Sequence, residues 1–74
     1  MNNIQFNQEL FGRLAPREIE IVKAASEGLS IKESMERFGV KRSTIAKHRA
    51  RIIFKLSCKN ISGAVGMLKD AGII

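Results

Sequence analysis

Seven cationic side chains lie in one 20-residue segment, residues 41–60, and no acidic side chain accompanies them. They are Lys41, Arg42, Lys47, Arg49, Arg51, Lys55 and Lys59. The whole chain of 74 residues carries a net charge of +6, so this segment accounts for the entire excess. Cations concentrated in this way neutralise phosphates and displace the counterions around a polyanion. The segment therefore predicts a nucleic-acid partner; a merely solvated basic helix face is the alternative.

The same segment has the apolar spacing of a helix, which we predict over Arg42–Leu56. At about 100° per residue, Ile45, Ile52 and Leu56 share one face. The opposite face holds Ala46, Lys47, Ala50, Arg51 and Phe54, and Arg49 and Lys55 flank the apolar stripe. We expect the apolar stripe to pack on the domain and the basic face to point outward. Phe54 has three open roles: packing under the N-terminal residues, contacting a partner, or simple exposure.

A second helix and a tight turn precede the basic helix. The run Ser30-Ile31-Lys32-Glu33 is a capping box, in which the hydroxyl and the carboxylate each satisfy a free amide at a helix start. This helix is predicted to end at Gly39, so that only residues 39–41 join it to the basic helix. A helix, a tight turn containing Gly and a second helix form the helix-turn-helix pattern.

Two further helices are predicted on either side of this pair. Pro is favoured at the first helical position, so the first helix should run from Pro16 to about Glu27. The last helix is predicted to have Ser62 as its N-cap and to end before Gly72. The predicted fold class is therefore all-α, a four-helix helix-turn-helix domain.

Length and composition fit one small domain with a thin core. Residues 1–13 are expected to form an N-terminal arm, and residues 14–74 to form the helix-turn-helix domain. No apolar run approaches the roughly 18 residues of a membrane span, and the start lacks the pattern of a secretory signal. A single cysteine, Cys58, suits a reducing compartment. These features predict a cytoplasmic protein without a membrane partner.

Enzymatic chemistry has no support in the sequence. There is no Gly-rich phosphate loop and no plausible pair of catalytic carboxylates. One histidine, His48, and one cysteine, Cys58, cannot fill a metal site that needs three or four protein ligands. We therefore expect a binding protein that is not an enzyme and that uses no cofactor or metal.

Six short segments stand out by their order and spacing: Leu14-Ala15-Pro16-Arg17-Glu18, Glu27-Gly28-Leu29-Ser30, Ser43-Thr44-Ile45-Ala46-Lys47-His48, Lys55-Leu56, Ala64-Val65 and Gly72-Ile73. Together they resemble the LuxR/GerE-type helix-turn-helix domain. The resemblance covers about Leu14 to Ile74 and implies four helices, with the third in the DNA major groove and the fourth often forming a dimer contact. Since no receiver or ligand-binding domain is seen, the chain resembles the short stand-alone members typified by GerE.

The expected DNA contacts follow from the helix geometry and from this resemblance. Lys47 is expected to read a base, because lysine can donate to O6 and N7 of guanine. The resemblance places Ala46 and Ala50 at two further base-reading positions, where a methyl group can meet that of thymine. The expected phosphate contacts are Lys32, Lys41, Arg42, Ser43, Thr44, Arg49, Arg51 and Lys55.

The partners expected are double-stranded DNA and, through the resemblance, a second copy that contacts Val65, Gly66, Leu68 and Lys69 of the fourth helix. The alternative is that Val65 and Leu68 only face the domain's own core. RNA polymerase is a further candidate partner, since region four of sigma factors has a similar arrangement of four helices. A third possibility is that the chain is an antagonist that binds another regulator. The basic segment favours a sequence-specific DNA-binding transcription regulator, because an antagonist needs no uncompensated cations.

Overall fold

The computed structural model describes residues 12–74, which form four helices and no strand. The helices are α2 (Pro16–Ser26), α3 (Ile31–Phe38), α4 (Arg42–Leu56) and α5 (Ile61–Asp70). The predicted all-α class and the bounds of the basic helix are confirmed. Residues 1–11 of the predicted arm lie outside the described residues. None of the four helices is long and apolar enough to cross a membrane.

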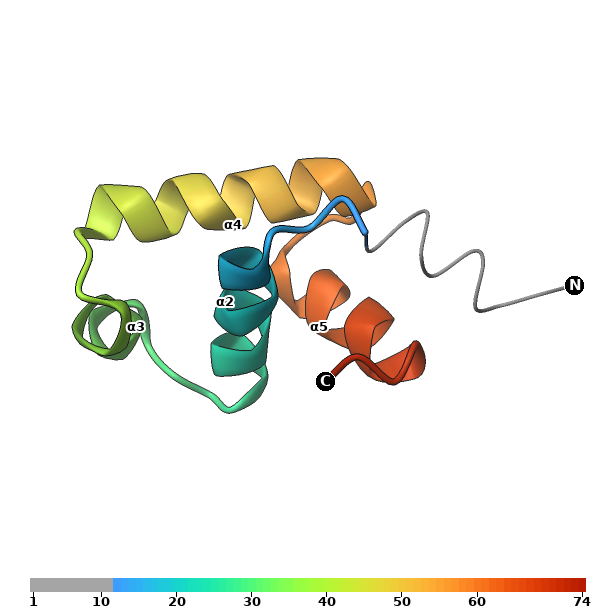
Figure 1. Cartoon of the computed structure of the whole chain (residues 1–74), viewed down its shortest axis with the longest axis horizontal. Coiled ribbons are helices and arrows are strands. Elements are labelled where there is room, and N and C mark those ends of the chain that lie inside the picture. Colours follow the sequence, from blue (N-terminus) through green and yellow to red (C-terminus); the bar gives the residue numbers. More distant parts are fainter. Residues whose placement is uncertain (1–11) are drawn as a thin grey trace, which may run out of the picture.

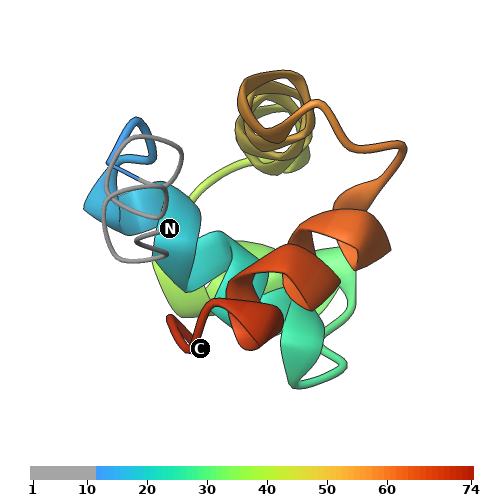
Figure 2. The ribbon, with the colours of Figure 1, turned by 90° about the vertical axis from the view of Figure 1, so that its right-hand side faces the viewer.

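The longest helix, α4, lies along one edge of the molecule, and α2, α3 and α5 lie beneath it (Figure 1). Figure 2, in which α4 is seen end-on, shows the other helices on one side of it only. The predicted stripe of Ile45, Ile52 and Leu56 is buried on that side. These three side chains pack in one cluster with Leu14, Ile21, Val22, Ala64 and Leu68. The core therefore holds α4 from behind and leaves its other side open.

The starts of α2 and α3 follow the predicted signals. Pro16 occupies the first position of α2. Ser30 caps α3: its hydroxyl accepts from the Glu33 amide at 3.1 Å, and the Glu33 carboxylate accepts from the Ser30 amide at 2.9 Å. Gly39 ends α3 with a φ of 64°, a left-handed conformation that glycine adopts without steric strain. This turn brings the chain directly into α4.

The start of α5 corrects the prediction. The N-cap is Asn60, not Ser62, and its side-chain oxygen accepts from the Gly63 amide at 2.9 Å. A Cβ on Gly63 would lie 3.2 Å from Cβ of Cys58, so the preceding loop approaches the first turn closely. The missing side chain of Gly63 allows this approach, and the helix begins at Ile61. The end of α5, before Gly72, is as predicted.

Candidate nucleic-acid interface

The outward side of α4 carries a continuous set of exposed side chains. They are Arg42, Ser43, Ala46, Lys47, Ala50, Arg51 and Phe54, and we call them the outer face of α4. Residues three and four apart meet on one side of a helix, which is why most of these positions gather opposite the buried stripe; Arg42 lies at the edge of the outer face. The division between outer face and buried stripe is the one that the helical spacing predicts.

Two lines of side chains run along the outer face. Ala46, Ala50 and Phe54 follow one another at intervals of four residues and form an apolar line. Lys47 and Arg51 form a parallel basic line. Within residues 12–74 neither cation has a carboxylate partner, since the ion pairs found there join other residues. The outer face thus offers free positive charge beside small apolar groups.

The start of α4 adds backbone donors to these cations. Lys41 has the extended backbone of an N-cap, but no side chain caps the helix there and no acidic residue occupies its first turn. The first amides of a helix are unpaired donors at the positive end of its dipole, and they attract anions such as phosphate. Ser43 is exposed at this end and Thr44 is half-buried, so the hydroxyl of Ser43 is the more accessible.

Substituting Lys41→Ser is expected to stabilise the fold and to weaken binding to DNA. A serine hydroxyl in this extended conformation can accept from an amide of the first turn, which is worth about 1 kcal/mol. For a domain of this size the melting temperature should rise by about 4–8 °C. Thermal unfolding and DNA titration measure the two effects. Lys41→Ala is the matched control, because it removes the charge without adding a cap; equal melting temperatures for the two variants would contradict the prediction.

Lys55 does not have the outward position expected of a phosphate contact. Its ammonium donates to the Glu18 carboxylate at 2.7 Å and to the Arg13 carbonyl at 3.0 Å. The Glu18 side chain is only 4% exposed, and it also accepts from the Ala15 amide at 2.8 Å. Lys55 therefore joins α4 to the start of α2. A phosphate would have to compete with this buried carboxylate for the Lys55 ammonium, so Lys55 is less available than the exposed cations of α4.

The Glu18 carboxyl is held in its charged form. Burial by itself raises the pKa of Glu18, but the hydrogen bonds from Lys55 and Ala15 and the nearby Lys55 ammonium lower this pKa by more than burial raises it. The net result is a pKa below the ordinary value. Through Lys55, Glu18 therefore fixes one side of α4.

His48 and Arg49 lie at the margins of the outer face, and both are half-buried. His48 Nδ1 and Arg49 Nε are buried, and neither has a hydrogen-bond partner in the part of the chain that the structure describes. Arg49 is therefore less available to a phosphate than Arg42 or Arg51. Lys32, the expected contact on α3, is exposed in the first turn of that helix.

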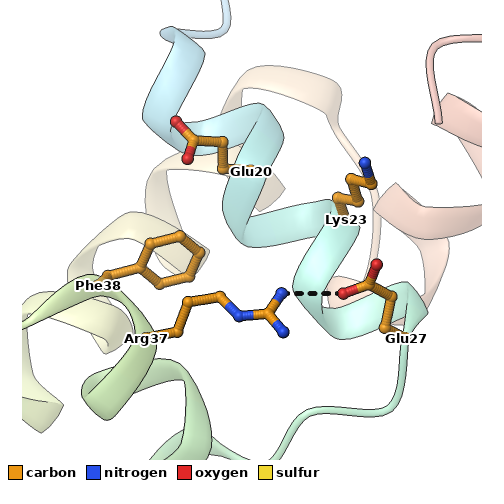
Figure 3. Close-up of a pocket in the computed structure, with 5 residues that line it drawn as sticks. All are labelled: Glu20, Lys23, Glu27, Arg37 and Phe38. Atoms are coloured by element: carbon orange, nitrogen blue, oxygen red, sulfur yellow. Dashed lines mark hydrogen bonds and ion pairs between the residues drawn. The ribbon is translucent and has the colours of Figure 1, made fainter.

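The surface between α2 and α3 has a different electrostatic character. A hollow there is lined by Glu20, Lys23, Glu27, Arg37 and Phe38 (Figure 3). Arg37 donates to the Glu27 carboxylate at 2.9 Å, and both side chains are about half exposed. Two cations and two carboxylates balance in this hollow, so it offers no excess positive charge.

The residues expected at a dimer contact on α5 differ in exposure. Gly66 and Lys69 are exposed, and Val65 is half-buried. Leu68 is fully buried in the chain's own core, which corrects its expected role as a contact to a second copy. Apart from its chain neighbours and the backbone of its own helix, no atom lies within 4 Å of the position that a Cβ on Gly66 would take, so a partner can approach closely there.

Comparison with known proteins agrees with this arrangement. The family described as bacterial regulatory proteins of the luxR family matches residues 13–68, which include α2, α3, α4 and most of α5. The chain is also similar to the transcriptional regulatory protein TdiR of Thauera aromatica, with 37% identity over 59 residues. That match covers 80% of this chain but only 26% of the relative, so the chain spans about a quarter of the relative's length. The chain belongs to the luxR family of bacterial regulatory proteins.

Proposed function

We propose that this chain binds double-stranded DNA in a transcription regulator, with the outer face of α4 in the major groove. The observation that carries the proposal is the position of Lys47 and Arg51, which are exposed on one side of α4 and have no carboxylate beside them. Arg42 adds a further exposed cation at the start of the helix. The major groove of B-DNA is about 12 Å wide and admits a helix. Membership of the luxR family supports this reading.

We propose two roles for the residues of the outer face: some contact bases and others contact phosphates. We assign base contacts to Lys47, with Ala46 and Ala50 beside it. Phosphate contacts are assigned to cations and hydroxyl groups at the start of α4 and along its basic line, and to Lys32 on α3. This set is Lys41, Arg42, Ser43, Thr44, Arg51 and Lys32, with Arg49 at the margin. Lys55 acts instead by fixing the angle of α4 on α2.

The proposal is tested by measuring the affinity for duplex DNA at several salt concentrations. Each neutralised phosphate contributes about −0.9 to the slope of log affinity against log salt, so four exposed cations predict a slope of about −3 to −4 per chain. Arg51→Ala should make this slope shallower by about one. Lys23→Ala, which removes a cation from the hollow between α2 and α3, is the matched control and should leave it unchanged.

Two outcomes would overturn this function. One is an absence of DNA binding even at low salt; the other is an equal effect of Arg51→Ala and Lys23→Ala on the slope. Capture of RNA polymerase by a chain that binds no DNA would favour the sigma-like reading instead. The salt series separates these cases, because an interaction led by phosphates weakens steeply as salt rises.

We also propose that two copies bind together through the exposed side of α5, around Val65, Gly66 and Lys69. Their half-sites should then lie one helical turn apart, about 10–10.5 base pairs. Gly66→Gln places a bulky, uncharged side chain at a position with open space, so the fold should survive while paired binding is lost. Sedimentation with one-site and two-site DNA measures this. If only one copy of the unmodified chain sediments with DNA that carries two half-sites, the proposal is contradicted.

A further inference from the structure

Phe54 is the large apolar side chain that the fold leaves in water. It is 85% exposed, and the part of the chain that the structure describes contains no other large hydrophobic residue in this state. A single exposed apolar residue is ordinary on a protein surface. The position of Phe54 is less ordinary, because it lies on the outer face of α4 beside the basic line.

The charge around Phe54 restricts what can cover it. Arg51 is exposed three residues before it, and Lys47 lies two turns before it on the same side of the helix. Both cations lack a carboxylate partner within residues 12–74. An occupant of this face must therefore supply negative charge to the cations and an apolar group to the phenyl ring at the same time. A DNA duplex does both, because phosphates flank a groove in which thymine methyl groups are exposed.

The spacing along α4 fits such a duplex. At 1.5 Å of rise per residue, the apolar line from Ala46 to Phe54 is about 12 Å long, which corresponds to three or four stacked base pairs. A straight helix moves away from the curved groove towards its ends. The phenyl group of Phe54 extends further from the helix axis than the methyl groups of Ala46 and Ala50, so it can still reach base edges at the end of the helix.

The chemistry of the ring selects the base. A phenyl group cannot accept or donate a strong hydrogen bond, and it would desolvate the polar edges of guanine, cytosine or adenine at a cost in free energy. The apolar group in the major groove is the 5-methyl of thymine. We propose that Phe54 is a specificity-determining residue that contacts a thymine 5-methyl group and extends the apolar line of Ala46 and Ala50 by one further base step. This inference rests on the proposed DNA binding.

The test removes the methyl group without changing the base pair. A duplex is selected from random DNA with the unmodified chain, and each thymine is then replaced in turn by deoxyuridine. At one thymine near the end of the α4 footprint, loss of the methyl should lower the affinity of the unmodified chain by roughly three- to fivefold, the value of one buried methyl group. Phe54→Ala should bind the two duplexes equally well, and Phe54→Leu should keep part of the discrimination.

The controls separate this inference from the proposed function. Arg51→Ala should bind both duplexes more weakly and keep the discrimination between thymine and deoxyuridine. A chain that binds no DNA overturns the proposed function. A chain that binds DNA, but in which Phe54→Ala discriminates as the unmodified chain does, overturns only the role of Phe54. The melting temperature and sedimentation of Phe54→Ala should be unchanged; a lower melting temperature or a changed assembly would show that protein covers the ring, and would also overturn the inference.

Discussion

Substituting Glu18→Ala is expected to lower the free energy of unfolding by about 2–4 kcal/mol, because it leaves the Lys55 ammonium beside the core without its carboxylate. The Glu18 side chain is buried, whereas that of Lys55 is 32% exposed, so part of the cost is relieved by water. A domain of 74 residues has a total stability of only about 4–11 kcal/mol. The melting temperature should therefore fall by about 10–20 °C.

The exposed ion pair between Arg37 and Glu27 provides the matched control. Its side chains are 51% and 43% exposed, and exposed pairs contribute about 0–1 kcal/mol. Glu27→Ala should thus change the melting temperature by only a few degrees. Thermal and urea unfolding of the two variants measure the difference directly. Equal losses for Glu18→Ala and Glu27→Ala would mean that Glu18 does not hold α4 in place.

The same pair makes stability depend on pH. The pKa of the Glu18 carboxyl in the folded chain lies below its ordinary value of 4.5, although burial alone would raise it, because the Lys55 and Ala15 hydrogen bonds lower it. A lowered folded pKa means that the contribution is complete above the ordinary value and is lost as the pH falls through the folded pKa. Glu33, whose pKa is lowered by the bonds from Ser30, acts in the same direction.

Glu18→Gln isolates the charge of this group, since the amide can still accept from the Ala15 backbone. The stability difference between the unmodified chain and Glu18→Gln should be constant near neutral pH. It should shrink once the pH falls below the ordinary value of 4.5, where the unfolded carboxyl takes up a proton, and it should be lost as the pH falls through the lower folded pKa. Urea unfolding from pH 7 to pH 3 measures this difference. A stability difference that stays constant from pH 7 to pH 3 would contradict the stabilising role of the Glu18 charge.

Local chemistry was enough to predict most of the fold. Pro16, the Ser30 capping box and Gly39 act within one turn of themselves, and the helices begin and end where those signals predict. The start of α5 was not predictable in this way. Asn60 and Ser62 are both good N-cap residues, and the sequence does not show which of the two side chains reaches an amide of the first turn. In the structure it is Asn60, which accepts from the Gly63 amide.

The candidate interface was predictable to the extent that it lies on one helix. Periodicity alone decides that Lys47 and Arg51 face away from Ile52. Periodicity does not show which cations are already paired. The carboxylate that engages Lys55 lies 37 residues earlier in the chain, on α2.

Leu68 shows a second limit of the helical pattern. Its spacing correctly places it on the apolar face of α5. The spacing of apolar residues cannot tell whether such a face is covered by the chain's own core or by a second copy. Packing against α2 and α4 decides the question for Leu68, which has no exposed surface left for a partner. For Val65, which is half-buried, the contact with a second copy stays a prediction.

Substituting Lys47→Ala is expected to lower the affinity for the best DNA site by about 10- to 100-fold, corresponding to the 1–3 kcal/mol of one good base contact. Lys47 is exposed at the middle of the outer face, and the small side chains of Ala46 and Ala50 leave it room to reach a base edge. Binding to random DNA should weaken less, since it depends on the other cations. The variant should therefore bind a broader set of sequences.

Selection of bound duplexes from random DNA, carried out with the unmodified chain and with Lys47→Ala, measures this change in preference. One guanine position of the selected site should lose its preference in the variant. Arg51→Ala is the control, because loss of a phosphate contact weakens binding to all sequences alike and leaves the preference intact. The melting temperature of Lys47→Ala should stay the same, because the side chain is exposed and has no ion-pair partner within residues 12–74. An unchanged preference with uniformly weaker binding would make Lys47 a phosphate contact, and an unchanged affinity would remove α4 from the groove.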